Sequence, residues 1–137
     1  MRMNRGIKIL IVVACVTVAF FLGLSRFSAN RDGRKLQEVQ AVAWKLPVFS
    51  GFREVESSTT SGSVSAMVTR RFKCISDCDG AVEYYSQTLG ASGWSRDSSM
   101  RSRNETLFRK GDLTISVFRS EASNVYDYAL DVTWRSR

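Results

Sequence analysis

Two cysteines, Cys74 and Cys78, are the residues of this chain whose type and spacing point most directly to chemistry. In "KCISDCDG" they are separated by three residues, a spacing that suits a metal site, a redox pair or a structural disulfide. Structural zinc needs four ligands, and the chain holds three cysteines and no histidine, so a metal site is not expected. A redox pair normally has the spacing C-x-x-C beside a helix, with two residues between the cysteines where this chain has three.

We predict that Cys74 ends a strand and that Cys78 begins the following helix, so that a disulfide joins them across a tight turn. An exported domain lies in an oxidising compartment, where such a bond persists. The closed loop is short, so the bond would stabilise the fold by about 2 kcal/mol. Two alternatives remain open. A helix N-terminus would lower the thiol pKa of Cys78 and favour a redox couple, and both thiols could also be unpaired.

The composition argues against most other catalytic chemistry. Without histidine the chain lacks the commonest general base, which excludes Ser-His-Asp and Cys-His catalysis. No glycine-rich phosphate loop opens a helix. Asp77, Asp79 and Glu83 gather at a predicted helix start. Capping and the helix dipole explain them with the fewest assumptions, and a weak cation site is the alternative. We therefore predict that the protein is not an enzyme and has no catalytic residue, no metal and no cofactor.

A candidate binding surface combines aromatic and arginine side chains. Tyr84 lies on the predicted helix, Arg119 and Tyr126 flank a loop, and Arg135 ends the last strand. Aromatic rows at strand spacing more often belong to a core than to a groove. These four residues form the candidate surface, with the core as the competing interpretation for the aromatic ones.

The net charge of +7 does not predict nucleic-acid binding, because most of it lies near the N-terminus. Residues 46–137 hold twelve basic and eleven acidic residues, so this part is nearly neutral. The basic excess flanks an apolar segment, where it can meet anionic lipid headgroups. We expect no nucleic-acid partner, and no small-molecule substrate is identifiable.

The apolar segment runs from Ile9 to Leu24, "ILIVVACVTVAFFLGL", without a charge, and follows the basic head "MRMNRGIK". A basic head before an apolar run is typical of an export signal. We predict a signal anchor, a transmembrane helix, over residues 1–25, which holds the protein in the membrane. Cleavage near "GLS" and lipid attachment at Cys15 are the alternatives. Basic residues flank both sides almost equally, and we favour an inside N-terminus.

Residues 26–46 are predicted to form a juxtamembrane linker and a short amphipathic stem helix. Asp32 can cap this helix and Pro47 can end it. Its apolar residues recur at near-helical spacing: Leu36, Val39, Val42, Ala43 and Leu46. This stripe packs either on the following domain, which is our prediction, or on the membrane surface.

Residues 47–137 are predicted to form an extracytoplasmic domain, periplasmic or on the cell surface. Two strands, "FREVES" and "SVSAMVTRRFKC", precede the helix "AVEYYSQTL". The segment "STTSGS" between the strands is predicted to form a turn. Arg70 interrupts an apolar row, so we expect this end of its strand to lie at a sheet edge or the side chain to point outward. A hairpin, "TLFRKGDLTISVFRS", and a strictly alternating last strand, "VYDYALDVTW", follow. The fold class is therefore α+β: a transmembrane helix, then two layers with one helix packed on an antiparallel sheet, ββαβββ-like.

The run "YYSQTLGASGW … TLFRKGDLTISV" resembles small exported, membrane-anchored bacterial domains of unassigned function. The residues that carry the resemblance cover about a third of the chain: Tyr84, Tyr85, Leu89, Gly93, Trp94, Phe108, Lys110, Gly111, Asp112, Leu113, Ile115 and Val117. The resemblance implies a fold and an exported location, and it implies no catalytic residue.

From these features we expect a single-pass, membrane-anchored binding or accessory module of the cell envelope that contacts another envelope protein. One alternative is a membrane-tethered thiol redox protein that uses Cys74 and Cys78. Another is a pilin-like structural subunit. Such subunits usually have a glutamate five residues into the mature helix, and this chain has Ile11 there.

Overall fold

The computed structural model describes residues 33–102 and 104–136. The predicted anchor over residues 1–25 and the predicted cap Asp32 lie outside the described residues. Within the described part, no helix has the length and apolar character needed to cross a membrane.

A helix over residues 33–45, the stem helix, precedes six strands and a second helix. The elements follow in this order: β1 (Phe52–Gly62), β2 (Ser65–Cys74), α2 (Ala81–Ala91), β3 (Ser95–Ser102), β4 (Glu105–Lys110), β5 (Leu113–Arg119) and β6 (Tyr128–Arg135). The six strands form one sheet in the order β1-β2-β6-β5-β4-β3, and every neighbouring pair is antiparallel. The α+β class is confirmed, with one strand more than the ββαβββ pattern.

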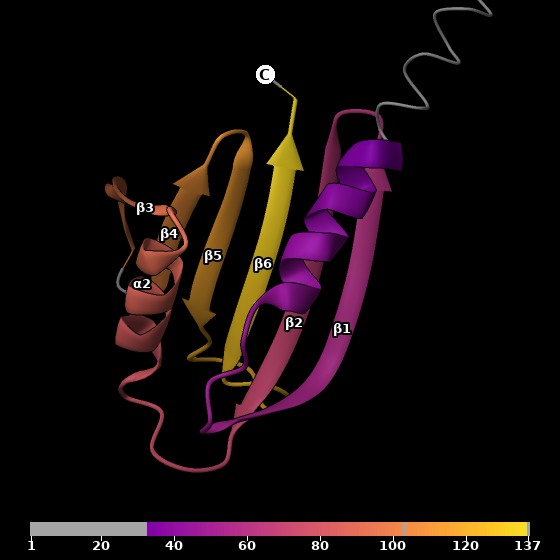
Figure 1. Cartoon of the computed structure of the whole chain (residues 1–137). Coiled ribbons are helices and arrows are strands. Elements are labelled where there is room, and N and C mark those ends of the chain that lie inside the picture. Colours follow the sequence, from indigo (N-terminus) through magenta and orange to yellow (C-terminus); the bar gives the residue numbers. More distant parts are fainter. Residues whose placement is uncertain (1–32, 103, 137) are drawn as a thin grey trace, which may run out of the picture.

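Both helices lie on the same face of the sheet (Figure 1). The stem helix covers the part formed by β1 and β2, and α2 lies at the other end, beside β3 and β4 (Figure 1). The opposite face carries no helix of the described chain. Two layers result, and the core lies between the helices and the sheet.

The core follows from the alternation of side chains along the strands. In β6 the residues that face the helices are buried: Tyr128, Leu130, Val132 and Trp134. β6 lies between β2 and β5, so the most regular strand pattern of the sequence belongs to a central strand. From α2, Ala81, Tyr85 and Leu89 complete the core, as their helical spacing predicts.

The stem helix belongs to the domain. Val39 and Ala43 are fully buried and Leu46 nearly so, which confirms that the apolar stripe packs on the sheet. Near the start of its described part, the Lys35 ammonium lies 2.7 Å from the carboxylate of Asp112 in the β4–β5 turn and ties the helix to the sheet. The same carboxylate accepts a hydrogen bond from the indole N–H of Trp134 at 2.9 Å.

Arg70 contradicts the expectation of an edge position or an outward side chain. It faces the stem helix from β2 and is only 6% exposed. Its guanidinium donates to the carbonyl oxygens of Ala43 and Leu46, at 3.1 and 3.2 Å, and pairs with Glu54 at 2.6 Å. The last carbonyls of a helix have no partner within the helix, and Arg70 supplies one.

Two local predictions were also wrong. The segment "STTSGS" is not a turn: β1 continues through it to Gly62, and the chain reverses at residues 63–64. Long-range pairing with β2 outweighs the turn preference of these small polar residues. The start of α2 has Gly80 as its N-cap and no side-chain cap, and Asp77 instead accepts a hydrogen bond from the backbone N–H of Asp79.

Candidate functional site

The corner between β2 and α2 contains the cysteine pair. The sulfur atoms of Cys74 and Cys78 lie 2.05 Å apart, at disulfide distance, as the spacing predicts. Cys74 is the last residue of β2, and Cys78 precedes α2 by three residues. The Cys78 residue is 6% exposed, so the helix side of this corner is part of the core.

Two residues at the start of β6 hold this corner against the sheet. Asp127 accepts a hydrogen bond from the backbone N–H of Cys74 at 2.9 Å and pairs with the Lys73 ammonium at 3.1 Å. The hydrogen bond from the Cys74 backbone N–H, and to a lesser extent the one from the Lys73 ammonium, holds the pKa of the Asp127 carboxyl below its usual value. The Tyr128 hydroxyl donates to the carbonyl oxygen of Cys78 at 3.2 Å.

The structure does not bring the four residues of the candidate surface together. Tyr84 packs edge-on against Phe49 and Tyr85 on the helix side of the molecule. Arg119 ends β5 with its guanidinium over the Tyr128 ring, also on the helix side.

Tyr126 and Arg135 belong to the other side of the sheet, at its opposite ends. The ring of Tyr126 lies under the guanidinium of Arg71, before β6 begins. Arg135, the last residue of β6, lines a hollow on the open face. Of the four predicted residues, only Arg135 lines this hollow.

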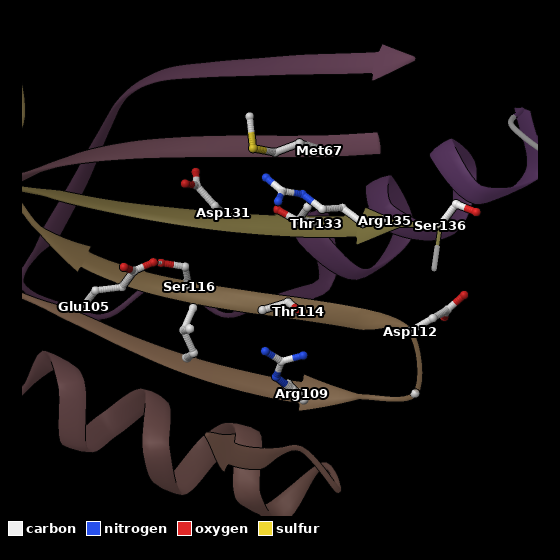
Figure 2. Close-up of a pocket in the computed structure, with 12 residues that line it drawn as sticks. Met67, Glu105, Arg109, Asp112, Thr114, Ser116, Asp131, Thr133, Arg135 and Ser136 are labelled. Atoms are coloured by element: carbon white, nitrogen blue, oxygen red, sulfur yellow. Dashed lines mark hydrogen bonds between the residues drawn. The ribbon is translucent and has the colours of Figure 1, made fainter. Parts of the chain in front are cut away.

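The hollow on the open face has a volume of about 450 Å³, within the range of ligand sites. Its lining comes from β2, β4, β5 and β6 and the turn between β4 and β5 (Figure 2). Three lining residues, Met67, Leu107 and Gly111, have no polar side chain. The others are polar: Glu105, Arg109, Asp112, Thr114, Ser116, Asp131, Thr133, Arg135 and Ser136. The hollow lies over the middle of the sheet, on the four neighbouring strands β2, β6, β5 and β4.

Asp131 is the most unusual of the lining residues. It lies on central strand β6, directly between Thr69 of β2 and Ser116 of β5 in the register of the sheet. The Thr69 hydroxyl donates to its carboxylate, but the buried Oδ1 atom has no hydrogen-bond partner among the described residues. Burial raises the pKa of this carboxyl, because a desolvated charge is disfavoured.

Glu105 contributes a second carboxylate to the same end of the hollow. The Ser116 hydroxyl donates to its Oε1 atom at 2.6 Å (Figure 2). The charge of Glu105 also raises the pKa of Asp131, a smaller effect than burial. The two carboxylates therefore stand on either side of Ser116.

Two arginines lie toward the other end of the hollow. Figure 2 shows the guanidinium groups of Arg109 and Arg135 over the same stretch of sheet, beyond the two acidic side chains. Arg109 is partly neutralised, because its Nε–H donates to the Asp97 carboxylate. Within residues 33–102 and 104–136, Arg135 has no ion-pair partner.

A second hollow, of about 360 Å³, lies between the stem helix and α2. Its floor includes Leu89, Trp94 and Leu113, which already belong to the buried core. Lys45 and Lys110 stand at its rim. This hollow lies between the two helices, and among the described residues none of the buried side-chain polar atoms that line it lacks a hydrogen-bond partner.

Sequence reasoning missed the open-face hollow, although one signal for it existed. The last strand places Asp131 and Thr133 on a face opposite to its apolar row, in the middle of the domain. The pattern predicts which face is polar, but not that Glu105 and Ser116 of other strands lie beside Asp131. Among the described residues, no group of three or more cysteine or acidic side chains is arranged to hold a metal ion.

The chain matches no known protein family, no curated protein and no solved structure. The resemblance to small exported domains therefore stays a prediction. Any function has to be argued from the geometry described above.

Proposed function

We propose that the protein is a single-pass, membrane-anchored binding module that contacts another protein of the cell envelope through the open face of its sheet. The observation that carries this proposal is the contrast between the two faces. One face is buried under both helices, and the other presents a polar hollow of about 450 Å³ over the central strands. Binding sites are concave and place a few polar groups that converge on the ligand, and this hollow supplies such groups from several strands.

The anchor and the location are part of the proposal. The uncharged run from Ile9 to Leu24 is close to the length that a spanning helix needs, and the basic head precedes it. A disulfide between Cys74 and Cys78 suits an oxidising compartment, which supports an extracytoplasmic domain. Residue 33, the first described residue of the stem helix, follows the apolar run by nine positions, so the domain would stand close to the membrane.

The location is tested by trapping thiols in the full-length protein in its own membrane. An alkylating reagent is added without reductant, and the masses of the peptides that contain Cys74 and Cys78 are measured. We expect an unmodified, mutually bonded pair. Two alkylated cysteines would place the domain on the reducing side and would overturn the extracytoplasmic part of the proposal.

The binding face is tested by a photo-reactive residue placed at one of two positions. Thr133 lines the hollow, and Gln87 is exposed on α2 on the other side of the molecule. We expect the Thr133 position, and not the Gln87 position, to cross-link one envelope protein in intact cells. Asp131→Asn combined with the Thr133 probe should weaken that cross-link. No cross-link at Thr133, or equal yields at the two positions, would contradict the proposal.

A further inference from the structure

The acidic end of the open-face hollow is built from two strands that are not adjacent. Asp131 lies on β6 and Glu105 on β4, with Ser116 of β5 between them. Ser116 is 8% exposed and Thr69 is 7% exposed, so the hydroxyls that contact these carboxylates belong to the buried sheet. The acidic groups are therefore held in place before any ligand arrives, which lowers the entropy cost of binding.

These two carboxylates lack a close cationic partner. Within the described residues neither Asp131 nor Glu105 forms an ion pair. Arg71, whose charge acts on Asp131, is itself paired with Glu56 at 2.7 Å. One oxygen of Asp131 is also cut off from water without a hydrogen bond. A carboxylate with so little solvation gains more from an incoming cation than an exposed one does.

The basic group that completes the arrangement is Arg135. It lies four residues after Asp131 on the same face of β6, a separation of about 13 Å between their Cα atoms at the rise of a strand. Figure 2 shows its side chain turned back over β6 toward Asp131, with Thr133 between them. Its guanidinium is exposed and has no ion-pair partner in the described part of the chain.

We propose that the hollow binds a segment of the partner protein that carries a cationic side chain next to an acidic one. The ammonium or guanidinium group would lie against Asp131 and Glu105, and the carboxylate against Arg135. This inference rests on the proposed function and names the chemistry of the partner. Phosphate-rich ligands such as nucleic acids do not fit, because the two carboxylates at the acidic end of the hollow would repel a run of phosphates.

The test uses small probes that carry the same charges. The purified full-length protein in neutral detergent is titrated with 6-aminohexanoate, which has both charges, and with butylammonium and hexanoate, which have one each. Binding is followed by the NMR signals of the open-face residues. We expect 6-aminohexanoate to bind at least tenfold more tightly than either single-charge probe.

Variants assign each charge to its partner. Asp131→Asn should reduce the affinity for 6-aminohexanoate about tenfold and abolish the response to butylammonium. Arg135→Gln should reduce the affinity for 6-aminohexanoate similarly and abolish the response to hexanoate. The matched controls are Glu121→Gln and Arg53→Gln, which change exposed charges outside the hollow and should leave all affinities unchanged. Thermal melting of each variant shows that it is folded.

The outcomes separate this inference from the proposed function. The inference is overturned if no probe binds, or if the Asp131 and Arg135 variants bind as the controls do. In that case a cross-link from Thr133 would still support a binding face of other chemistry. If the probes bind as expected and prevent the cross-link at Thr133, both the inference and the proposed function are supported. If they bind without any cross-linked protein, the hollow takes a free zwitterion and the protein-segment proposal fails.

Discussion

The guanidinium of Arg70 lies 2.6 Å from the carboxylate of Glu54, beneath the end of the stem helix. The arginine side chain is 8% exposed and the glutamate 31%, so the pair is largely withdrawn from water. The same guanidinium also lies 5.3 Å from the centres of the Trp44 and Phe72 rings. Arg70 therefore joins β1, β2 and the stem helix at one point.

Replacing this arginine should loosen the stem helix. Arg70→Met leaves the Glu54 carboxylate and two helix carbonyls without their partner, which should lower the free energy of unfolding by about 3 kcal/mol. Arg71→Met is the control, because Arg71 forms a more exposed ion pair and should cost less than about 1 kcal/mol. Urea unfolding measures both values. If the two variants lose equal amounts of unfolding free energy, the burial of Arg70 does not strengthen its contribution to stability.

A second prediction concerns the close approach of β1 to the cysteine loop. A Cβ atom at Gly51 would lie 2.9 Å from the Phe49 ring and 3.0 Å from the carbonyl oxygen of Asp77. Gly51→Ala should therefore destabilise the fold by about 1–3 kcal/mol, the cost of overpacking. Gly80→Ala, where a Cβ atom would meet nothing within 4 Å, should change stability by less than about 1 kcal/mol. Thermal unfolding compares the two, and an unaffected Gly51→Ala variant would refute the tight contact.

The pH dependence of stability should report on Asp131. Its folded pKa lies above the ordinary value of 3.8, so the native state binds more protons than the unfolded chain between these two pKa values. The free energy of unfolding attributable to this group therefore falls as pH rises through that window, and protonation below it restores the stability. Asp131→Asn removes the charge and should therefore raise the free energy of unfolding at pH 7.

The measurement for Asp131 is urea unfolding of the wild type and the variant from pH 4 to pH 8. The difference between them should grow with pH, and Glu121→Gln should show no such difference. Glu105 and Arg71 also face Asp131, so Glu105→Gln should reduce the pH effect without removing it. A variant less stable than the wild type at pH 7 would contradict the inferred cost of the buried charge.

The disulfide between Cys74 and Cys78 should stabilise the fold and should have no redox function. Exchanging Cys74 and Cys78 together for serine should lower the free energy of unfolding by about 2 kcal/mol, the value for a short closed loop. The double variant should no longer respond to dithiothreitol, whereas the wild type should lose a similar amount of stability when reduced. The reduction potential of the cysteine pair distinguishes a structural disulfide from a redox couple. A value above about −200 mV, in the range of catalytic thiol pairs, would favour the redox alternative.

The sequence by itself determined the elements that local pattern controls. Alternation predicted β6 and the β4–β5 hairpin, where Gly111 takes a φ of +62° in the turn, and helical spacing predicted both helices. The pairing of Cys74 with Cys78 was also predictable, because only three residues separate the two cysteines along the chain. Such features depend on neighbours within a few residues, which a single sequence shows directly.

Only the tertiary structure decided the role of Arg70 and the position of the open-face hollow. Arg70 looks like a break in an apolar row until the stem helix, whose last carbonyls need donors, is placed over it. Asp131 looks like an ordinary polar-face residue until the strand order puts Thr69 and Ser116 beside it. Both depend on contacts between strands and helices far apart in the chain. The alternation along one strand shows which face it buries, but not which strands become its neighbours.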